Sequence, residues 1–246
     1  MKQRGAQRRG GSLSPIRKGR LHERVLNAIR DAIYSGHFAP GEALRELRLA
    51  GELQVSQGTI REALLRLERT GLVERTSQKE TRVVQLSRKQ QRDRVELRAI
   101  LEGIAAVRAA EHMTPADFAE LRQLGHEIVR AQAADDLFEV SQADLRFHRF
   151  IWRHAQNDAL CQVLEMLSAP MFAYVSLQRA RDLSRWVGMP HEAVTRALQQ
   201  GDADQIKSAV ASHIERSFEQ FLHEGRSESE PVGRETREPR GPHARP

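Results

Sequence analysis

The sequence predicts a mainly α-helical protein with two folded parts: helices that end in a small β-hairpin, and then an all-helical bundle. Two short runs, at 72–75 and 82–86, have the apolar and β-branched content typical of strands. Elsewhere apolar residues recur at the three- and four-residue spacing of amphipathic helices, and no convincing strand pattern occurs over 87–222. The chain of 246 residues is long enough for two ordinary domains.

Composition excludes several classes of protein. Apolar residues make up 39% of the chain and charged residues 29%, with a mean hydropathy of −0.58. No run approaches the roughly 18 apolar residues that a membrane-spanning helix needs, and no apolar stretch follows the basic N-terminus as in a secretory signal. Cys161 is the single cysteine, so we expect neither an internal disulfide nor a thiolate metal site. These features predict a cytoplasmic protein with no membrane partner.

Charge and sequence complexity divide the chain into four parts. Residues 1–15 form a basic arm and 225–246 a tail, and both have too few apolar residues to offset the entropy of ordering, so we expect disorder in both. Between them we expect a hairpin-containing domain at 16–88 and a helical domain at 89–224. Residues 1–88 carry 18 Lys and Arg against 9 Asp and Glu, which indicates a nucleic-acid-binding module joined to a second domain. A solvated basic face is the alternative.

The first domain is predicted to contain helices at 21–35, 45–53 and 56–70, followed by strands at 72–75 and 82–86. Ser56 has the hydroxyl of a good N-cap, which fixes the start of the third helix. The expected inward face of the second helix is Leu47, Leu49, Ala50 and Leu53. The expected inward face of the third is Ile60, Ala63, Leu64 and Leu67.

The second and third helices are joined by a tight connection at 54–56, which is the helix-turn-helix arrangement. In such a pair the second helix presents its first residues to base edges in the major groove. Arg61 can contact guanine with two hydrogen bonds, and Gln57 can pair with adenine. We expect the exposed residues there to be Gln57, Gly58, Thr59 and Arg61. A three-helix packing unit without a ligand is the alternative.

The spacing of several motifs in the first domain resembles the DNA-binding domain of GntR-type transcriptional regulators. The segments are I-Y-S-G at 33–36, V-S-Q-G-T-I-R-E-A-L at 55–64 and G-L-V at 71–73, within a resemblance that covers about 21–86. The resemblance implies a winged helix-turn-helix in which Arg61 and Gln57 lie in the groove and the hairpin is a wing. The residues expected to contact DNA are Arg45, Arg48, Ser56, Gln57, Gly58, Thr59, Arg61, Lys79 and Arg82.

The second domain is predicted to be a helical bundle. The expected helices cover 89–111, 114–134, 137–154, 158–183, 190–201 and 202–223. Thr114 followed by Pro115 is typical of a helix start, and Asp202 is an expected N-cap. Pro170 is expected to bend or break the fourth of these helices.

Four polar residues of the bundle could form a divalent metal site. Asp144 and His148 are four residues apart on one predicted helix, so their side chains project from one face. His191 and His213 lie on the last two helices. One carboxylate and three imidazoles would suit zinc, nickel, manganese or iron. On its own the pattern is weak, because inward histidines are more often hydrogen-bonded core residues.

The bundle sequence also resembles the FCD domain, the ligand-binding domain of the FadR-like branch of GntR regulators. The matching segments are D-L-R-F-H at 144–148, H-E-A-V at 191–194 and His213, and with the first domain the resemblance spans about 21–222. It implies that Asp144, His148, His191 and His213 ligate a divalent metal ion, with zinc favoured, and that a small organic acid binds there. Arg98, in the segment L-R-A-I-L-E, is the candidate effector-binding residue.

These expectations together describe a ligand-responsive, homodimeric transcriptional repressor that binds a short palindromic operator in double-stranded DNA. Two other functions stay open at this point. A metal-dependent enzyme could use an Asp/His₃ site to activate water, although no HExxH, GxSxG or GxxxxGK[ST] segment is present. A structural DNA-binding protein would show weak sequence preference and no response to small molecules.

Overall fold

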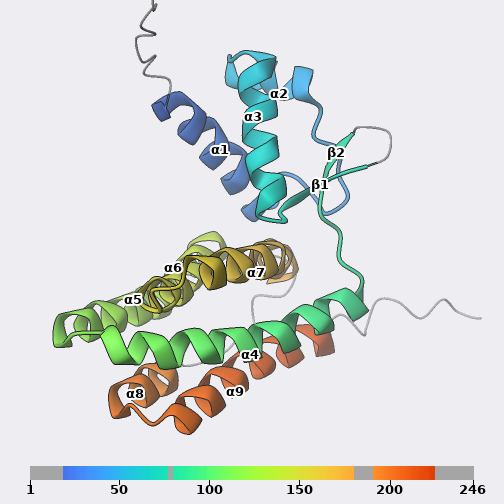
Figure 1. Cartoon of the computed structure of the whole chain (residues 1–246). Helices are drawn as coiled ribbons and strands as arrows, with labels where there is room; N and C mark the ends of the chain where they lie inside the picture. Colours follow the sequence, from blue (N-terminus) through green and yellow to red (C-terminus); the bar gives the residue numbers. More distant parts are fainter. Residues whose placement is uncertain (1–18, 77–79, 180–190, 225–246) are drawn as a thin grey trace, which may run out of the picture.

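A computed structural model describes residues 19–76, 80–179 and 191–224 (Figure 1). The N-terminal arm, the C-terminal tail, Lys79 and the expected helix end at 183 lie outside the described residues. The described chain forms a small N-terminal unit that stands on one side of a helical bundle. None of the described helices has the length and apolar character needed to span a membrane.

The N-terminal unit has the predicted winged helix-turn-helix architecture. It comprises helices α1 Gly19–Tyr34, α2 Glu46–Leu53 and α3 Gln57–Arg69, and strands β1 Val73–Arg75 and β2 Thr81–Val83. The two strands pair antiparallel, with Val73 opposite Val83. Gln54 ends α2 in the left-handed conformation (φ 51°), which turns the chain sharply into α3.

Two details of this unit differ from the sequence prediction. Leu47 was expected to face inward, but its exposed fraction is 74%, so that expectation is wrong. A helix as short as α2 buries only a narrow face. Leu49 is its one fully buried residue. The second strand was expected at 82–86 and instead ends at Val83, after which the chain leads toward the bundle.

The bundle consists of helices α4 Arg88–His112, α5 Pro115–Ala133, α6 Leu137–His154, α7 Asp158–Arg179, α8 Glu192–Gln200 and α9 Ala203–Glu224. Their starts follow from local capping. Ser87 and Thr114 each form a capping box, and the Asp202 carboxylate accepts the backbone N–H groups of Asp204 and Gln205. Gly201, with φ 76°, ends α8.

Helix α7 was expected to bend or break near Pro170. Within the described residues it does not break there, because one helix runs from Asp158 to Arg179. The expectation of a break is therefore wrong. A proline removes one helical hydrogen bond without ending a helix when neighbouring groups satisfy the freed carbonyl.

The hydrophobic core extends from the N-terminal unit into the bundle. One cluster joins Ile60 and Leu72 of the winged unit to Trp152, Ala169 and Phe172 of the bundle. A second cluster fills the interior among α4, α5, α6, α8 and α9. The two units are thus packed on each other at α7, which contacts α1 and lies close to Gly71 in the turn before β1 (Figure 1).

Candidate DNA-reading helix and metal centre

The start of α3 is built by its N-cap. The Ser56 hydroxyl accepts the backbone N–H of Thr59 and shares a second hydrogen bond of 2.9 Å with the Thr59 hydroxyl. Thr59 has an exposed fraction of only 7%, so the expectation that it would be exposed is wrong. Its side chain completes the cap instead. Gln57 and Gly58 are exposed, as expected.

Arg61 is exposed near the start of α3, one turn after Gln57, and is held by one acidic partner. Its guanidinium donates two hydrogen bonds to Glu46 at the start of α2, at 3.1 Å and 2.7 Å. The hydrogen bonds to Glu46 and the negative charge of Glu46 raise the pKa of Arg61 above its usual range. The pair therefore holds a solvent-accessible guanidinium near the start of α3, four residues after Gln57.

The other described residues expected to contact DNA lie around this helix start. Arg45 is exposed at the N-cap of α2, and Arg48, also exposed, pairs with Glu52 at 2.7 Å. Arg82, on β2, is half-buried because it donates to the Gly41 carbonyl and pairs with Glu80. Arg82 therefore fastens the wing to the preceding turn.

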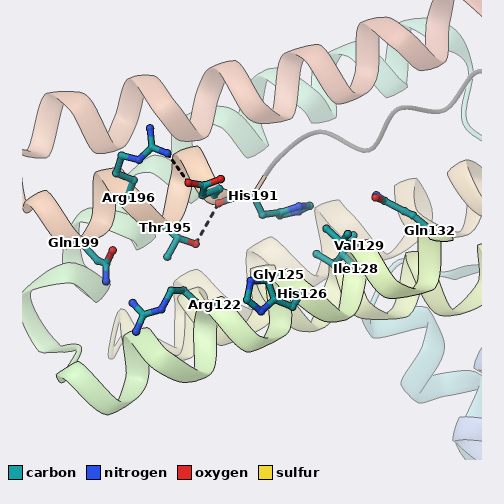
Figure 2. Close-up of a pocket in the computed structure, with 11 residues that line it drawn as sticks. Arg122, Gly125, His126, Ile128, Val129, Gln132, His191, Thr195, Arg196 and Gln199 are labelled. Carbon is teal, nitrogen blue, oxygen red and sulfur yellow. Dashed lines mark hydrogen bonds and ion pairs between the residues drawn. The ribbon is translucent and has the colours of Figure 1, made fainter. Parts of the chain in front are cut away.

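A cavity of about 410 Å³ lies between α5 and α8. Its walls carry Arg122 and His126 from α5 and Thr195 and Arg196 from α8, while His191 lies on its inner side (Figure 2). Arg196 is already paired with Glu192 at 2.6 Å. His191, which precedes α8, links this cavity to a cluster of polar groups inside the bundle.

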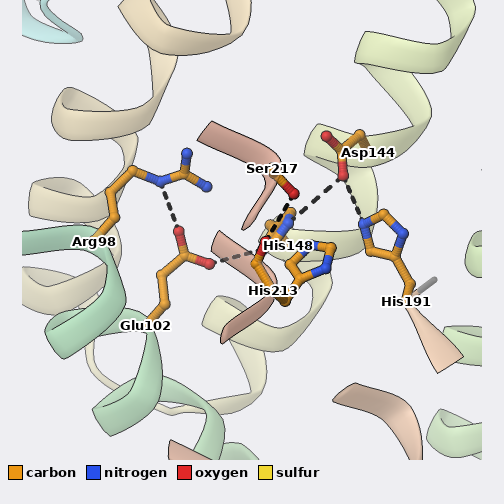
Figure 3. A network of polar contacts seen from close by, with 7 residues as sticks. All are labelled: Arg98, Glu102, Asp144, His148, His191, His213 and Ser217. Atoms are coloured by element: carbon orange, nitrogen blue, oxygen red, sulfur yellow. Dashed lines mark hydrogen bonds and ion pairs between the residues drawn. The ribbon is translucent and has the colours of Figure 1, made fainter. Parts of the chain in front are cut away.

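That cluster brings together the four residues proposed as metal ligands. Asp144, His148, His191 and His213 each offer one ligand atom, and these atoms all lie within 4.8 Å of one another (Figure 3). His191 Nε2 is 2.7 Å from Asp144 Oδ1, and His148 Nε2 is 3.6 Å from the same oxygen. The three histidines are buried.

A buried carboxylate orients His148. Glu102 Oε2 accepts the Nδ1 proton of His148 at 2.7 Å, and Glu102 Oε1 accepts a hydrogen bond from Arg98 at 2.8 Å. Burial raises the pKa of Glu102, but Arg98 and His148 outweigh burial and lower it to about 2. Glu102 is therefore ionised, and it fixes the His148 tautomer with Nε2 toward Asp144. Sequence reasoning did not assign Glu102 this role, although its i, i+4 spacing from Arg98 was a signal for the ion pair.

The protonation of His213 suits a cation. Burial lowers the pKa of His213 well below its usual 6.5, and His191 and His148 lower it further. Neutral imidazoles and an ionised carboxylate are the forms that bind a divalent metal. The donor set and its second-sphere carboxylate are therefore consistent with a metal-binding site.

Arg98 lies beside the cluster. It lines a small cavity of about 50 Å³ together with Asp144, His148 and His213. Its guanidinium also lies over the Phe172 ring, 5.3 Å from the centroid. Arg98 is thus near the candidate ligands, but its Nε is already committed to Glu102.

Comparison with known proteins identifies both domains. Residues 21–83 match the family described as bacterial regulatory proteins, gntR family, and residues 93–216 match the FCD domain. The Nta operon transcriptional regulator of Aminobacter aminovorans is 30% identical over 191 residues, which are 76% of this chain and 88% of that protein. The HTH-type transcriptional repressor RspR of Escherichia coli is 26% identical and covers 81% of this chain and 88% of its own length.

A solved structure has the same fold. The Escherichia coli McbR/YncC structure superposes with a TM-score of 0.73 at 23% identity, over 82% of this chain and 98% of its own. The named relatives are transcriptional regulators and not enzymes. The chain belongs to the GntR family of DNA-binding transcriptional regulators, in the FadR-like branch whose C-terminal domain is an FCD domain.

Proposed function

We propose that the protein is a dimeric repressor whose α3 reads a short palindromic operator and whose bundle binds a metal ion and a small organic acid. The DNA-binding domain would occupy 16–88 and the effector and dimerisation domain 89–224. The exposed start of α3, where Gln57 and Arg61 lie one turn apart on the same face, supports the reading role. Arg45, Arg48 and Arg82 would contact phosphates beside it.

Replacement of Arg61 tests the reading role. In Arg61→Ala, affinity for a duplex that the wild-type protein selects from a random pool should fall about 10- to 100-fold, because one bidentate base contact is lost. Arg69→Ala removes the same charge from the far end of α3 and serves as the matched control. Equal affinities of Arg61→Ala and Arg69→Ala at fixed salt would show that α3 does not read bases in this way.

The ion in the bundle would be held by Asp144, His148, His191 and His213, and zinc is our first candidate. The single observation that carries this proposal is the convergence of one carboxylate and three imidazoles within 4.8 Å. A bound cation supplies a Lewis-acidic position for a carboxylate ligand. Glu102 keeps His148 in the required tautomer, and Arg98 adds positive charge at the edge of the site.

Zinc titration tests the cluster. We expect one zinc per wild-type chain and a large loss of affinity in His191→Ala, with wild-type binding in His112→Ala, which removes an exposed histidine at the end of α4. Wild-type zinc affinity in His191→Ala would contradict the assignment.

The effector proposal needs its own experiment. Small mono- and dicarboxylates should raise the melting temperature of the zinc-loaded protein, because a ligand that binds only the folded state stabilises it by mass action. The shift should disappear with a chelator and shrink in Arg98→Met. An operator affinity that does not change with any stabilising acid would exclude an effector role, since regulation requires different affinities for two conformations.

A further inference from the structure

Helix α7 contains a backbone carbonyl that its own helix cannot satisfy. Pro170 has no N–H, so the carbonyl of Met166, four residues earlier, loses its helical donor. Met166 is exposed, so either water or a side chain can replace the lost donor. The helix nevertheless continues through Pro170, so other groups must compensate at this turn.

Arg94, on α4, supplies the missing donor. Its Nη1 donates to the Met166 carbonyl at 3.0 Å and approaches the Leu167 carbonyl at 3.4 Å. Among the described residues no carboxylate lies within ion-pair distance of Arg94, which is unusual for a partly buried guanidinium. Burial lowers the pKa of Arg94 below its usual range. Its charge is thus directed at exposed backbone dipoles of α7.

The DNA-binding unit rests on the same carbonyl. Gly71, in the turn between α3 and β1, approaches so closely that an added Cβ would be 3.0 Å from the Met166 oxygen and 3.8 Å from Pro170. Gly71 also adopts φ 70°, a conformation that other residues rarely take. One peptide group of α7 therefore contacts the winged unit and Arg94 together.

The next turn of α7 reaches the candidate metal site. Met171 and Phe172 line the cavity that contains Asp144, His148 and His213, and Arg98 stacks on Phe172. The turn that supports the DNA-binding unit and the turn that borders the cluster are consecutive on one helix. A shift of this segment would therefore move both the surface that Gly71 contacts and the wall of the cavity beside the cluster.

We propose that Arg94 is a positioning residue for DNA binding: by holding the carbonyl that Pro170 frees, it fixes the turn of α7 on which Gly71 rests and so sets the orientation of the reading helix relative to the bundle. In a dimer held together by the bundles, this orientation sets the distance between the two reading helices. Arg94 acts through α7 and has no need to touch DNA itself.

The test of this role is how strongly DNA affinity depends on the spacing between the two half-sites of the operator. This test rests on the proposed dimer. The probes are the duplex that the wild-type protein selects from a random pool and versions of it with one or two base pairs inserted between the half-sites. Wild type should prefer the selected spacing by at least about 10-fold, and Arg94→Ala should reduce the preference to about 2-fold. Arg94→Lys, which keeps a donor, should recover part of it. Arg92→Ala, an exposed arginine of the same helix, should behave as wild type.

Hydrogen exchange and sedimentation complete the experiment. In Arg94→Ala the amides of 71–73, 166–169 and 171–172 should exchange faster, while those of α2 and α5 should not change. Wild-type spacing preference in Arg94→Ala overturns the proposal, whatever the exchange data show. If the wild-type protein binds all spacings equally, the proposal for Arg94 also fails. The mass from sedimentation then shows whether the protein is a dimer, and so whether the proposed dimer is wrong as well.

Discussion

Glu102 illustrates how a residue outside the ligand set can control the cluster. Its carboxylate holds one ring nitrogen of His148 and one guanidinium nitrogen of Arg98, and all three side chains are buried. The sequence alone shows two residues on one helix four positions apart. It does not show that a histidine 46 positions later completes the contact.

Glu102→Gln should lower zinc affinity about 10- to 100-fold, the usual effect of losing a carboxylate that orients a ligating histidine. Competition with a fluorescent chelator measures this. Glu96→Gln removes an exposed carboxylate from the same helix and should bind zinc as the wild type does. Urea unfolding of the metal-free variants separates a loss of zinc affinity from a loss of fold. Unchanged zinc affinity in a folded Glu102→Gln protein would contradict the orienting role.

Tyr34 should make stability depend on pH in the alkaline range. Burial raises the pKa of Tyr34 from 10.0 to about 12, with a smaller, opposing effect of Arg149. Since the folded-state pKa is the higher one, its contribution is complete below pH 10 and is lost as the pH rises from 10 towards 12. One pKa unit corresponds to about 1.4 kcal/mol, so the loss approaches about 3 kcal/mol.

Urea unfolding of wild type and Tyr34→Phe between pH 9 and 12 measures this dependence, because the variant lacks the hydroxyl that titrates. As the pH rises from 10 to 12, the unfolding free energy of the wild type should fall more than that of Tyr34→Phe. Parallel curves for the two proteins would show that the phenol is not desolvated by the packing of α1 on the bundle.

At the scale of elements, capping residues made the helix starts predictable. Ser56, Thr114 and Asp202 begin helices where their side chains indicated, because a cap is satisfied by backbone groups two or three residues away. The errors concern longer-range contacts. Leu47 fits the inward spacing of α2 but faces solvent, and Pro170 fits a helix break but is accommodated by Arg94, 72 positions before Met166.

The turn between α3 and β1 should be the more sensitive of two glycine positions with positive φ. Gly71→Ala and Gly201→Ala both place a Cβ in the left-handed region, which costs about 1 kcal/mol. At Gly201 nothing lies within 4 Å of that Cβ, whereas at Gly71 it meets the Met166 carbonyl at 3.0 Å. Overpacking adds about 1–3 kcal/mol, so unfolding free energies should fall further for Gly71→Ala. Equal losses in urea titrations would argue against a close contact between the turn and α7.

At the scale of the whole molecule, the sequence predicted the two domains but not their contact. The composition shift after residue 88 and the resemblance of each half to a known family separate the domains, and local patterns give their helices. The surface between them depends on which residues of α1, α3 and α7 meet, and such contacts have no sequence period. The assembly of the cluster is similar. Asp144 and His148 are a local pair, but no local pattern places His191 and His213 beside them, so the four-residue site was a weak prediction until the resemblance supported it.

The shared core predicts cooperative unfolding. Because one buried cluster includes Leu72 of the winged unit and Ala169 and Phe172 of the bundle, opening the contact exposes apolar surface on both sides. Scanning calorimetry should give one transition, with a calorimetric enthalpy close to the van't Hoff value at each protein concentration. Two separated transitions would mean that the domains melt independently.

The ion pair between Arg61 and Glu46 has a consequence for how the molecule would search a genome. In the free protein the Arg61 guanidinium already donates to the Glu46 carboxylate. A group on the DNA must therefore bind the guanidinium more strongly than Glu46 does before Arg61 leaves the ion pair. A phosphate would interact with the guanidinium about as strongly as the carboxylate does. A base that lacks two suitably placed acceptors would interact more weakly. A correctly placed guanine has two acceptors in the geometry of the guanidinium fork. If α3 reads bases as proposed, the exposed ion pair with Glu46 would therefore give way to guanine more readily than to the other bases.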